Sequence, residues 1–456
     1  MSVRLTSRRR LGIPLLATAA LVASLLGTVA GPSAAGAARS TGHRIAPVPA
    51  ITGHIQSAAL KDPPSTADCQ ALLHINCYSP PQFQQAYNLG PLYRDGFTGR
   101  GRTIVIVDSF GSPTIRNDLH VFDQTYGLPD PQLDIIQPAG AVPPFDPTNS
   151  DMLGWASETT LDVEWAHAIA PGAKLLLVET PVAETEGLQG FPEIVKAENF
   201  VVDHNLGDVI SQSFGATEQT FDSQQQLLGQ RSAFVNALRH GVSVLASSGD
   251  QGAAAVAKNG TDLLPFPAVI WPSSDPLVTS LGGTQLFLDA GGNRTAPDTA
   301  WNDGFGATGG GVSSVFQRPI FQAGHQNVVD GHRGIPDISM SAAVDGGVVV
   351  FYTFDPTRAG YHVFGGTSEA APLFAGVVAI ADQIAGHRLG WLNPELYLLG
   401  HLPARLTGIV DVTTGNNSFG GITGYPSLPG YDLTTGLGTI DANRFCRTLA
   451  GRPFGH

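Results

Sequence analysis

The sequence predicts an α/β fold, with a doubly wound, mostly parallel sheet flanked by helices. Short apolar runs without alternation are separated by stretches with helical spacing, and polar side chains follow the runs directly. Strands buried on both faces read as continuous apolar runs, and an alternating order of strands and helices is typical of a helix-covered parallel sheet. We therefore expect functional side chains at the carboxyl edge of that sheet.

The individual elements can be predicted in chain order. Four apolar runs are predicted to be strands: Thr103–Phe110, Ala173–Thr180, Asp208–Gly215 and Val242–Asp250. Two stretches between them are predicted to be helices, Ser157–Ala168 and Phe221–His240, because their apolar side chains keep helical spacing. Residues 265–316, which are rich in Gly and Pro and contain the short strands GGTQLFLD and GGGVSSVF, predict loops and hairpins around the carboxyl edge.

The first 37 residues are predicted to be a secretory signal peptide. Four arginines precede an uncharged run from Leu11 to Ala30, and the small residues Ala35–Ala37 follow it. A membrane anchor is the alternative, because the run approaches the roughly 20 residues that span a bilayer. Its Gly, Ala and Thr content favours cleavage, so we expect a secreted, extracellular protein. Residues 38–79 are predicted to be a short pro-segment or linker before one domain over 80–456.

The composition excludes several classes of partner. With 42% hydrophobic and 14% charged residues, the chain is globular. Without residues 1–37 it carries 21 Lys and Arg against 38 Asp and Glu, a formal charge of −17. Nucleic acid and anionic membrane surfaces are therefore not expected as partners. Many carboxylates and few lysines also indicate an acidic working environment, although genome base composition can deplete lysine as well.

Three cysteines are an odd number for an exported chain. Cys69 and Cys77 lie eight residues apart and are expected to pair, which leaves Cys446 as a free buried thiol. A metal site built on so few cysteines is not expected.

Ser368 stands between a glycine turn and a helix predicted to reach Ala385. In the first turn of a helix, a serine lies in the positive end of the helix dipole and can serve as a nucleophile. Serine and threonine are also ordinary helix caps, which is the alternative for Ser368 and Thr367. Pro372 favours the nucleophile, because proline is tolerated in a first turn and fixes the turn that carries the serine.

A pair of carboxylates is the best candidate for the base. Glu158 and Asp162 are four residues apart on a predicted helix and share one face. Two carboxylates held together commonly share one proton, so such a pair can act as a base and its orienting partner at acidic pH. The alternative is an exposed helix face that tolerates the repulsion at about 0.2–0.5 kcal/mol. Glu164 and His167, on other faces of the same helix, fit that alternative.

Asp250 ends a predicted buried strand in the stretch ASSGDQGA. An unpaired carboxylate is costly there unless it has a partner or a function. A protonated aspartic acid can donate a hydrogen bond to a developing oxyanion. The alternative is an ordinary turn residue at a strand end.

These segments resemble two related groups of peptidases. The arrangement T-S-x-x-x-P resembles the nucleophile signature of subtilisin-like serine peptidases, but no histidine stands in the HGTH-like stretch that supplies their base, and His240 only ends a predicted helix. The segments SETTLD, SSGDQG and GGTSEAAP, after TIVIVDSF, resemble the sedolisin (serine-carboxyl peptidase) family in the same order. The resemblance runs from about Tyr78 to the C-terminus and includes RGIPDISM and GGGVSSVF.

The resemblance implies a subtilisin-like fold and a Ser-Glu-Asp triad that works in acid. Its implied catalytic residues are Ser368 as nucleophile, Glu158 as general base and then acid, Asp162 as proton-sharing orienter, and Asp250 as oxyanion donor. Asp108, where subtilisins keep their catalytic aspartate, is outside the sedolisin triad and is left out. Ser213 and Gly215 match the edge that sedolisins lay against an extended substrate, a strand-addition mode.

The resemblance also implies one structural calcium ion near the C-terminus. The segments GIVDVTTGNN and LPGYDLTTGLGTID resemble the calcium loop of the family. The implied ligands are the carboxylates of Asp411 and Asp432 and the carbonyls of Val412, Leu428 and Gly430. Hard oxygen donors from turns suit Ca²⁺. Leu428 stands where the family often has glycine, and a carbonyl can come from either residue.

We therefore predict a secreted acid peptidase that cleaves peptides or proteins through an acyl-enzyme on Ser368 and acts as a monomer. A Ser-His-Asp subtilisin is disfavoured because its histidine motif is missing. A catalytically silent, calcium-stabilised secreted binding protein of the same fold is the alternative from another class. Sedolisins are typically made with a long folded pro-domain, whereas only residues 38–79 precede the resemblance here, so the route of activation stays open.

Overall fold

The computed structural model describes residues 55–60 and 62–451, which belong to one unit over 44–456. The predicted signal peptide, residues 1–37, lies outside the described residues. Among the residues that are described, no helix has the length and apolarity needed to cross a membrane.

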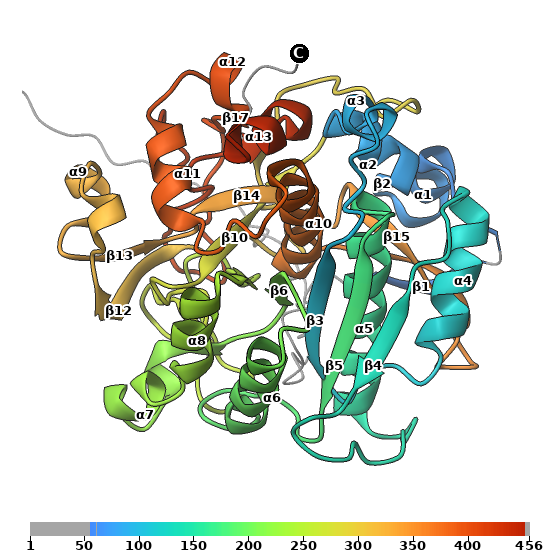
Figure 1. The fold of residues 1–456 in the computed structure, drawn as a ribbon, viewed down its shortest axis with the longest axis horizontal. Helices are drawn as coiled ribbons and strands as arrows, with labels where there is room; N and C mark the ends of the chain where they lie inside the picture. The colour runs from blue at the N-terminus through green and yellow to red at the C-terminus, as the bar shows by residue number, and fades with distance from the viewer. Residues whose placement is uncertain (1–54, 61, 452–456) are drawn as a thin grey trace, which may run out of the picture. The chain divides into compact units, whose positions relative to one another are not determined.

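Strands and helices alternate strictly from β3 to β6 (Figure 1). The strands are β1 Ile55–Leu60, β2 Cys77–Tyr78, β3 Thr103–Ser109, β4 Leu133–Ile136, β5 Lys174–Thr180, β6 Val209–Gln212, β7 Ala216–Thr217, β8 Ser243–Ser247, β9 Ile270–Trp271, β10 Thr279–Gln285, β11 Thr299–Ala300, β12 Gly311–Gln317, β13 His332–Ile335, β14 Ile338–Ser341, β15 Gly347–Tyr352, β16 Gly360–Phe364, β17 Ile409–Val410 and β18 Thr439–Ile440. The helices are α1 Thr66–Leu73, α2 Pro80–Ala86, α3 Gly90–Arg94, α4 Ile115–Tyr126, α5 Ser150–Ile169, α6 Phe191–Asp203, α7 Gln224–Leu228, α8 Ser232–His240, α9 Gln326–Val329, α10 Thr367–Ala385, α11 Asn393–Gly400, α12 Ala404–Thr407 and α13 Ala442–Leu449, with the short 3-10 helices η1 Glu218–Thr220 and η2 Ile320–Gln322.

The main sheet has the order β11-β10-β8-β6-β3-β5-β4, with β14 also paired to β10. Every pair except β10 with β11 is parallel. The four predicted strands form its centre, as β8, β6, β3 and β5. The predicted α/β fold with a mostly parallel sheet is therefore confirmed.

Both faces of this sheet are buried, which is why its strands read as continuous apolar runs. In β3, Ile104 and Ile106 join the core beneath α5 and α10, whereas Val105 and Val107 join the core beneath α6 and α8. Figure 1 shows these two pairs of helices around β3, β5 and β6. The helix layers fix the carboxyl ends of β3, β6 and β8 close to the start of α10.

Two sequence-based assignments were wrong in detail. The predicted helix Phe221–His240 is two helices, α7 and α8, because α7 ends at Gly229. β10, which we expected among the loops and hairpins of 265–316, is a strand of the main sheet. Its glycines are needed for close packing rather than for turns, since a Cβ at Gly282 would lie 2.5 Å from the Ser339 hydroxyl and one at Gly283 2.6 Å from the Ala342 Cβ.

A smaller sheet, β1-β16-β15-β2, contains the strand that leads into the Ser368 turn. Within the predicted pro-segment or linker, residues 66–78 form α1 and β2, which the lack of periodicity did not indicate. The expected Cys69–Cys77 disulfide is confirmed, and Cys446 is a free buried thiol as expected. Whether residues 38–79 are removed as a pro-segment stays a prediction.

A buried ion pair in the RGIPDISM segment ties β13 to the main sheet. Arg333 and Asp337 are both fully buried, and the guanidinium donates to Asp337 Oδ1 at 2.7 Å. The Tyr397 hydroxyl and the Ser280 N–H also donate to this carboxylate, each at 2.8 Å. The charges are therefore compensated and the acceptors satisfied, which is the condition for burying them.

We expect Asp337→Asn to lower the free energy of unfolding by about 3–5 kcal/mol, because it leaves the Arg333 charge buried without a partner. Urea denaturation at constant pH measures this loss. Asp222→Asn is the matched control, because Asp222 and Lys258 form an exposed ion pair. Its denaturation midpoint should stay close to that of the parent chain. Equal midpoints for the two variants would contradict the role given to the buried pair.

Candidate active site

The turn between β16 and α10 requires its two glycines. Gly366 has a φ of +126°, which residues with side chains rarely adopt, and a Cβ at Gly365 would lie 2.7 Å from the Val344 nitrogen. α10 begins at Thr367, so Ser368 lies in the first turn of the helix as predicted, and its side chain is fully buried. The backbone of the turn therefore fixes where Ser368 stands.

Pro372 lies in the second turn of α10, not in the first turn as we predicted. Because proline has no N–H, it cannot donate to the carbonyl of Ser368 four residues earlier. The Ser213 hydroxyl oxygen lies 3.3 Å from that carbonyl, but the hydroxyl has one proton and is closer to Asp162 Oδ1, at 2.9 Å. The proline thus leaves the Ser368 carbonyl without its helical donor, beside the end of β6.

Glu158 and Asp162 project from α5 into the interior of the protein. Asn149 caps the helix through bonds from the N–H groups of residues 151 and 152. Every residue of α5 from Trp155 to Ile169 is buried. The alternative of an exposed, solvated helix face is therefore wrong, and the two carboxyl groups lie in the core between α5 and α10.

Glu164 and His167, which fitted the exposed-face alternative, are also fully buried. The Phe351 N–H donates to Glu164 at 3.0 Å. His167 lies 3.3 Å from the Asp123 carboxylate and bonds to the Pro129 carbonyl, so it joins α5 to α4 and its following loop. Among the described residues, neither side chain forms a hydrogen bond with Ser368, Glu158 or Asp162.

Ser213 connects the acid pair with Ser368. Its hydroxyl donates to Asp162 Oδ1 at 2.9 Å, and its carbonyl accepts the Ser368 hydroxyl at 3.4 Å. The second distance is long for an O–H···O bond, so the Ser368 hydroxyl is weakly held and can turn to another acceptor. The Glu158 carboxylate accepts no hydrogen bond of normal length from the described residues and is available for that purpose.

Burial dominates the protonation of this pair. It raises the pKa of Glu158 well above its usual value, the charge of Asp108 raises it further, and the hydroxyls of Ser368 and Ser213 act in the opposite direction. Burial also raises the pKa of Asp162, with Glu158 as the next cause. Burial and the repulsion between their charges thus both favour the protonated forms, so this pair keeps protons to higher pH than exposed carboxyl groups do.

Asp108 is a third carboxyl group of this cluster, and sequence reasoning left it out. It is fully buried at the end of β3, and burial raises its pKa to about 7, opposed by the Thr159 hydroxyl and reinforced by Glu179. Its charge is among the causes that raise the pKa of both Glu158 and Asp162. Its position at the end of a buried strand was the sequence signal that pointed to it.

Asp250 lies at the start of α10, three residues beyond the end of β8. Its Oδ1 atom accepts both the backbone N–H and the hydroxyl of Thr367, each at 2.8 Å. The Gly249 N–H in turn donates to the Thr367 hydroxyl at 3.0 Å. The structure therefore places Asp250, the predicted oxyanion donor, in contact with Thr367, the residue before Ser368.

Glu369 is a first-turn residue of α10, as expected, but it is also fully buried. Burial raises its pKa well above the usual value, the Ser341 hydroxyl lowers it, and the Asp250 charge raises it. Burial thus favours the protonated, neutral form of this side chain.

Gly215 follows Ser213 at the predicted substrate edge. A Cβ at Gly215 would lie 2.9 Å from the Trp271 carbonyl oxygen, so glycine lets β7 pair with β9. The Ser213 side chain bonds to Asp162, which leaves only its backbone for a substrate. The role of both residues in substrate binding stays a prediction.

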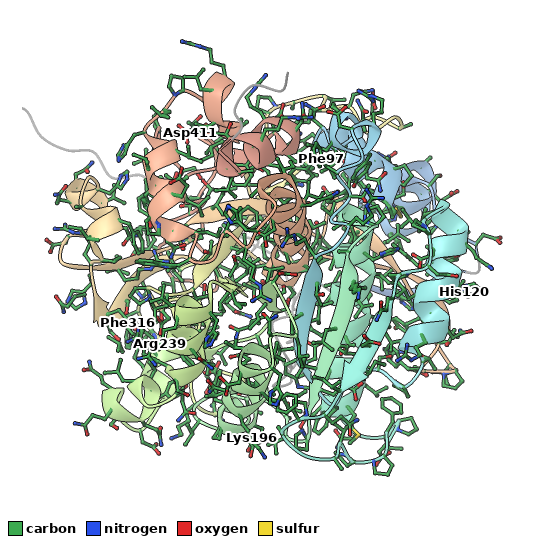
Figure 2. All side chains as sticks on the ribbon, in the orientation of Figure 1. Phe97, His120, Lys196, Arg239, Phe316 and Asp411 are labelled. Carbon is green, nitrogen blue, oxygen red and sulfur yellow. A yellow bond between two sulfur atoms is a disulfide. The ribbon has the colours of Figure 1, made fainter. Side chains whose placement is uncertain are left out.

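The predicted calcium ligands come together in the C-terminal part of the chain, where Asp411 follows β17 (Figure 2). The Gly430 N–H donates to Asp411 and the Leu428 N–H to Asp432, each at 2.8 Å. The loop with two of the predicted carbonyl ligands therefore contacts both carboxylates. Among the described residues, no Lys or Arg pairs with either carboxylate.

The donor set at these loops fits Ca²⁺. Within the described part of the chain, no group of three or more His, Cys, Asp or Glu side chains could hold a metal. A site here would therefore depend on the two carboxylates and on backbone carbonyls, which are oxygen donors of the kind Ca²⁺ takes from turns.

A histidine base is not found next to Ser368. Among the described residues, no histidine forms a hydrogen bond with its hydroxyl, which donates to the Ser213 carbonyl. His240 is exposed at the end of α8 and bonds to the Asn236 carbonyl. The observed arrangement thus differs from that of a Ser-His-Asp site.

The chain is also similar in sequence to known peptidases. The subtilase family model matches residues 151–395, which is more than half of the chain. Kumamolisin of Bacillus sp. (strain MN-32) is 33% identical over 384 residues, which cover 82% of this chain and 63% of that protein. Sedolisin of Pseudomonas sp. (strain 101) is 29% identical over 369 residues, which cover 79% of this chain and 60% of that protein. The chain thus spans about 60% of the length of these curated relatives.

A solved structure of Pseudomonas sedolisin, a serine-carboxyl proteinase complexed with two molecules of pseudo-iodotyrostatin, has the same fold. It superposes with a TM-score of 0.70 at 27% identity, and the match covers 83% of this chain and 100% of that chain. The subtilisin-like fold implied by the sequence resemblance is therefore confirmed.

We expect Glu158→Gln to raise the melting temperature at about pH 7 and to leave it nearly unchanged at about pH 3.5. A buried acid releases its proton at higher pH in the folded chain than in the unfolded chain. The free energy of unfolding therefore falls by about 1.4 kcal/mol per pH unit between the two pKa values, and glutamine removes this loss. Thermal melts at both pH values measure it, with the exposed Glu395→Gln as control. Equal loss of stability at both pH values would contradict the burial of an ionisable Glu158.

Proposed function

The chain belongs to the subtilase family and, within it, to the sedolisins, and on that premise we propose that it is a secreted serine-carboxyl peptidase active at acidic pH. The observation that carries the proposal is the buried chain of contacts from Asp162 through Ser213 to Ser368. Glu158 stands beside this chain without a bond of its own, and Asp250 bonds to Thr367 directly before the nucleophile.

Acylation would begin at the Ser368 hydroxyl. The Ser368 oxygen attacks the carbonyl carbon of the scissile peptide bond while its proton passes to the Glu158 carboxylate. Asp162, which shares a proton with Glu158, orients the base. Protonated Asp250 donates to the oxyanion of the tetrahedral intermediate. Glu158 then gives its proton to the leaving amine, and an ester on Ser368 remains.

Deacylation would repeat these steps with water as the nucleophile and Ser368 as the leaving group. Glu158 removes a proton from the water as its oxygen attacks the ester carbon, and Asp250 again stabilises the oxyanion. Glu158 returns the proton to the Ser368 oxygen, which releases the carboxylic acid product. The base and the acid are therefore the same group in both halves of the reaction.

The carboxyl cluster supports an acidic optimum. A base that is a carboxylate requires the Glu158–Asp162 pair to hold one proton rather than two or none, and the oxyanion donor requires a protonated Asp250. Raising the pH removes both required protons, and lowering it far enough protonates the base. A bell-shaped profile follows from these requirements, and its acidic maximum is the part that we propose from the family resemblance.

The catalytically silent binding protein remains the second candidate. The contacts of Asp162 with Ser213 and of Ser213 with Ser368 support the peptidase over this candidate. Secretion would suit a fold with a disulfide, since such bonds persist in oxidising compartments.

We expect peptide hydrolysis from pH 3 to pH 8 to peak in the acidic half of the range. Ser368→Ala should lower kcat by about 10⁴-fold or more, because the nucleophile is lost while oxyanion stabilisation remains. Glu158→Gln should lower it comparably, because the amide cannot accept the proton. A mixture of peptides analysed by mass spectrometry measures the rates and reveals the cleavage positions without assuming a specificity.

Glu395→Gln, at an exposed site, serves as the control for the charge change and should match the parent chain. An optimum near neutrality, or full activity of Glu158→Gln, would rule out the carboxylate mechanism. Folded parent chain without hydrolysis at any pH would favour the binding protein instead.

For the calcium loops, we expect removal of Ca²⁺ by a chelator to lower the melting temperature and added Ca²⁺ to restore it. A ligand at 100 times its Kd stabilises the folded state by about 2.7 kcal/mol. Asp411→Asn removes one charged ligand at an exposed position and should weaken this response. An identical melting temperature with chelator and with Ca²⁺ would show that the loops need no ion.

A further inference from the structure

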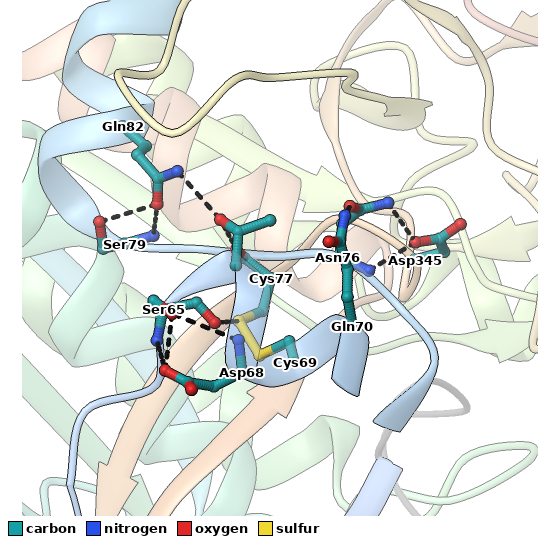
Figure 3. The surroundings of a disulfide bond; sticks show 10 residues. Ser65, Asp68, Cys69, Gln70, Asn76, Cys77, Ser79, Gln82 and Asp345 are labelled. Carbon is teal, nitrogen blue, oxygen red and sulfur yellow. Dashed lines mark hydrogen bonds between the residues drawn. A yellow bond between two sulfur atoms is a disulfide. The ribbon is translucent and has the colours of Figure 1, made fainter. Parts of the chain in front are cut away.

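Residues 65–78 form a loop that the Cys69–Cys77 disulfide closes (Figure 3). The disulfide joins α1 to β2, and both cysteines are buried. A capping box, in which the side chains of Ser65 and Asp68 each accept the backbone N–H of the other, fixes the start of α1. This disulfide-closed loop therefore keeps its shape with few interactions, because the crosslink removes conformations from the unfolded segment.

The disulfide-closed loop is paired to the strands that lead to Ser368. β2 pairs with the start of β15, and β15 pairs with β16, whose last residue Phe364 lies opposite Val348. Directly after β14, the Ala342 carbonyl accepts the Gly366 N–H at 2.6 Å. The cluster of apolar side chains that fills this region contains Cys69, Cys77, Ala342, Val344 and Val363. The first turn of α10 is therefore in contact with the same packing unit as the disulfide.

A second set of contacts connects the disulfide-closed loop with the candidate site, and it begins at Asn76. The backbone N–H and the side-chain amide of Asn76 both donate to Asp345 Oδ1, at 2.7 and 2.8 Å. The Gly346 N–H returns a bond to the Asn76 carbonyl at 3.0 Å. Figure 3 shows Asn76 between Gln70 and Asp345. Hydrogen bonds to a carboxylate are among the stronger ones, so this contact fixes Asp345 to the loop.

Further hydrogen bonds connect Asp345 with Asp250, the proposed oxyanion donor. Its backbone N–H donates to Asp303 Oδ2 at 2.9 Å. The other oxygen of Asp303 accepts the N–H groups of the turn at 305–306. The next residue, Ala307, donates its N–H to the Asp250 carbonyl at 2.9 Å. Consecutive hydrogen bonds thus lead from the loop to Asp250.

We propose that the disulfide-closed loop positions Ser368 and Asp250 relative to each other, with Asn76 and Asp345 as positioning residues. The inference rests on the proposed function, since it concerns the alignment of the nucleophile with the oxyanion donor. These two groups come from different elements, the start of α10 and the turn after β8. The loop is linked to both indirectly, to the first through the smaller sheet and to the second through Asp345 and Asp303. A misplacement of about 1 Å in such groups can cost about 10²-fold in rate.

Asn76→Ala in the full chain tests the proposal. It keeps the disulfide and removes the side-chain bond to Asp345. We expect kcat for peptide hydrolysis to fall by about tenfold to a hundredfold and KM to stay within about twofold, because alignment rather than binding is lost. Asp345→Ala should act likewise, whereas Asp345→Asn keeps an acceptor oxygen and should recover most of the rate.

Ser65→Ala is the matched control. It removes the cap of α1 and lowers stability, but it leaves the bonds between Asn76 and Asp345 in place. A loop that only stabilises the fold would make Ser65→Ala and Asn76→Ala equivalent in melting temperature and in kcat. That equivalence would overturn the proposal.

Amide hydrogen exchange separates this inference from the proposed function. In Asn76→Ala we expect faster exchange in residues 303–307 and 365–367 than in the parent chain, and no such change in Ser65→Ala. Unchanged exchange in these segments would overturn the inference, whether or not the protein hydrolyses peptides. Faster exchange in a chain without peptidase activity would support the inference and reject the proposed function alone.

Discussion

The burial of several carboxyl groups between α5, α10 and the carboxyl edge of the main sheet is the constraint on which the rest of the site depends. Glu158, Asp162 and Asp108 are fully buried, and within the described residues no Lys, Arg or His forms an ion pair with any of them. Such groups can be accommodated only if protons are shared or hydroxyl donors are supplied. The placement of Ser213 and Thr367 as donors, and the use of long buried helices to carry the acids, follow from this requirement.

Much of the fold could be predicted because apolar runs report burial directly. β3, β5, β6 and β8 carry side chains into two cores, and each therefore reads as a continuous apolar run. β10 gave no such signal, since Gly282 and Gly283 are needed for close contact with neighbouring strands and glycine suggests a turn. α1 was missed for the opposite reason, because it is held by a disulfide and a capping box and has almost no amphipathic pattern to read.

The residues of the candidate site were predicted largely through family resemblance, and the physical reading alone left alternatives open. The i, i+4 spacing of Glu158 and Asp162 is equally compatible with an exposed helix face, and only the packing of α5 against α10 excludes it. No sequence pattern could show that Ser213 bonds to Asp162, since the two residues meet only when β6 is placed beside α5. Asp108 lay at a predicted strand end, but its effect on the acid pair depends on the depth at which all three carboxyl groups are buried.

Pro372 has a consequence for attempts to make this protein more robust. Replacing a mid-helix proline by alanine is a standard way to regularise a helix, and here it would restore an N–H directed at the Ser368 carbonyl. The Ser213 hydroxyl, which donates to Asp162, lies 3.3 Å from the same carbonyl. A more regular helix would thus add a donor at the backbone of the proposed nucleophile, so an engineer who optimises thermal tolerance at Pro372 should also measure hydrolysis by the same variant.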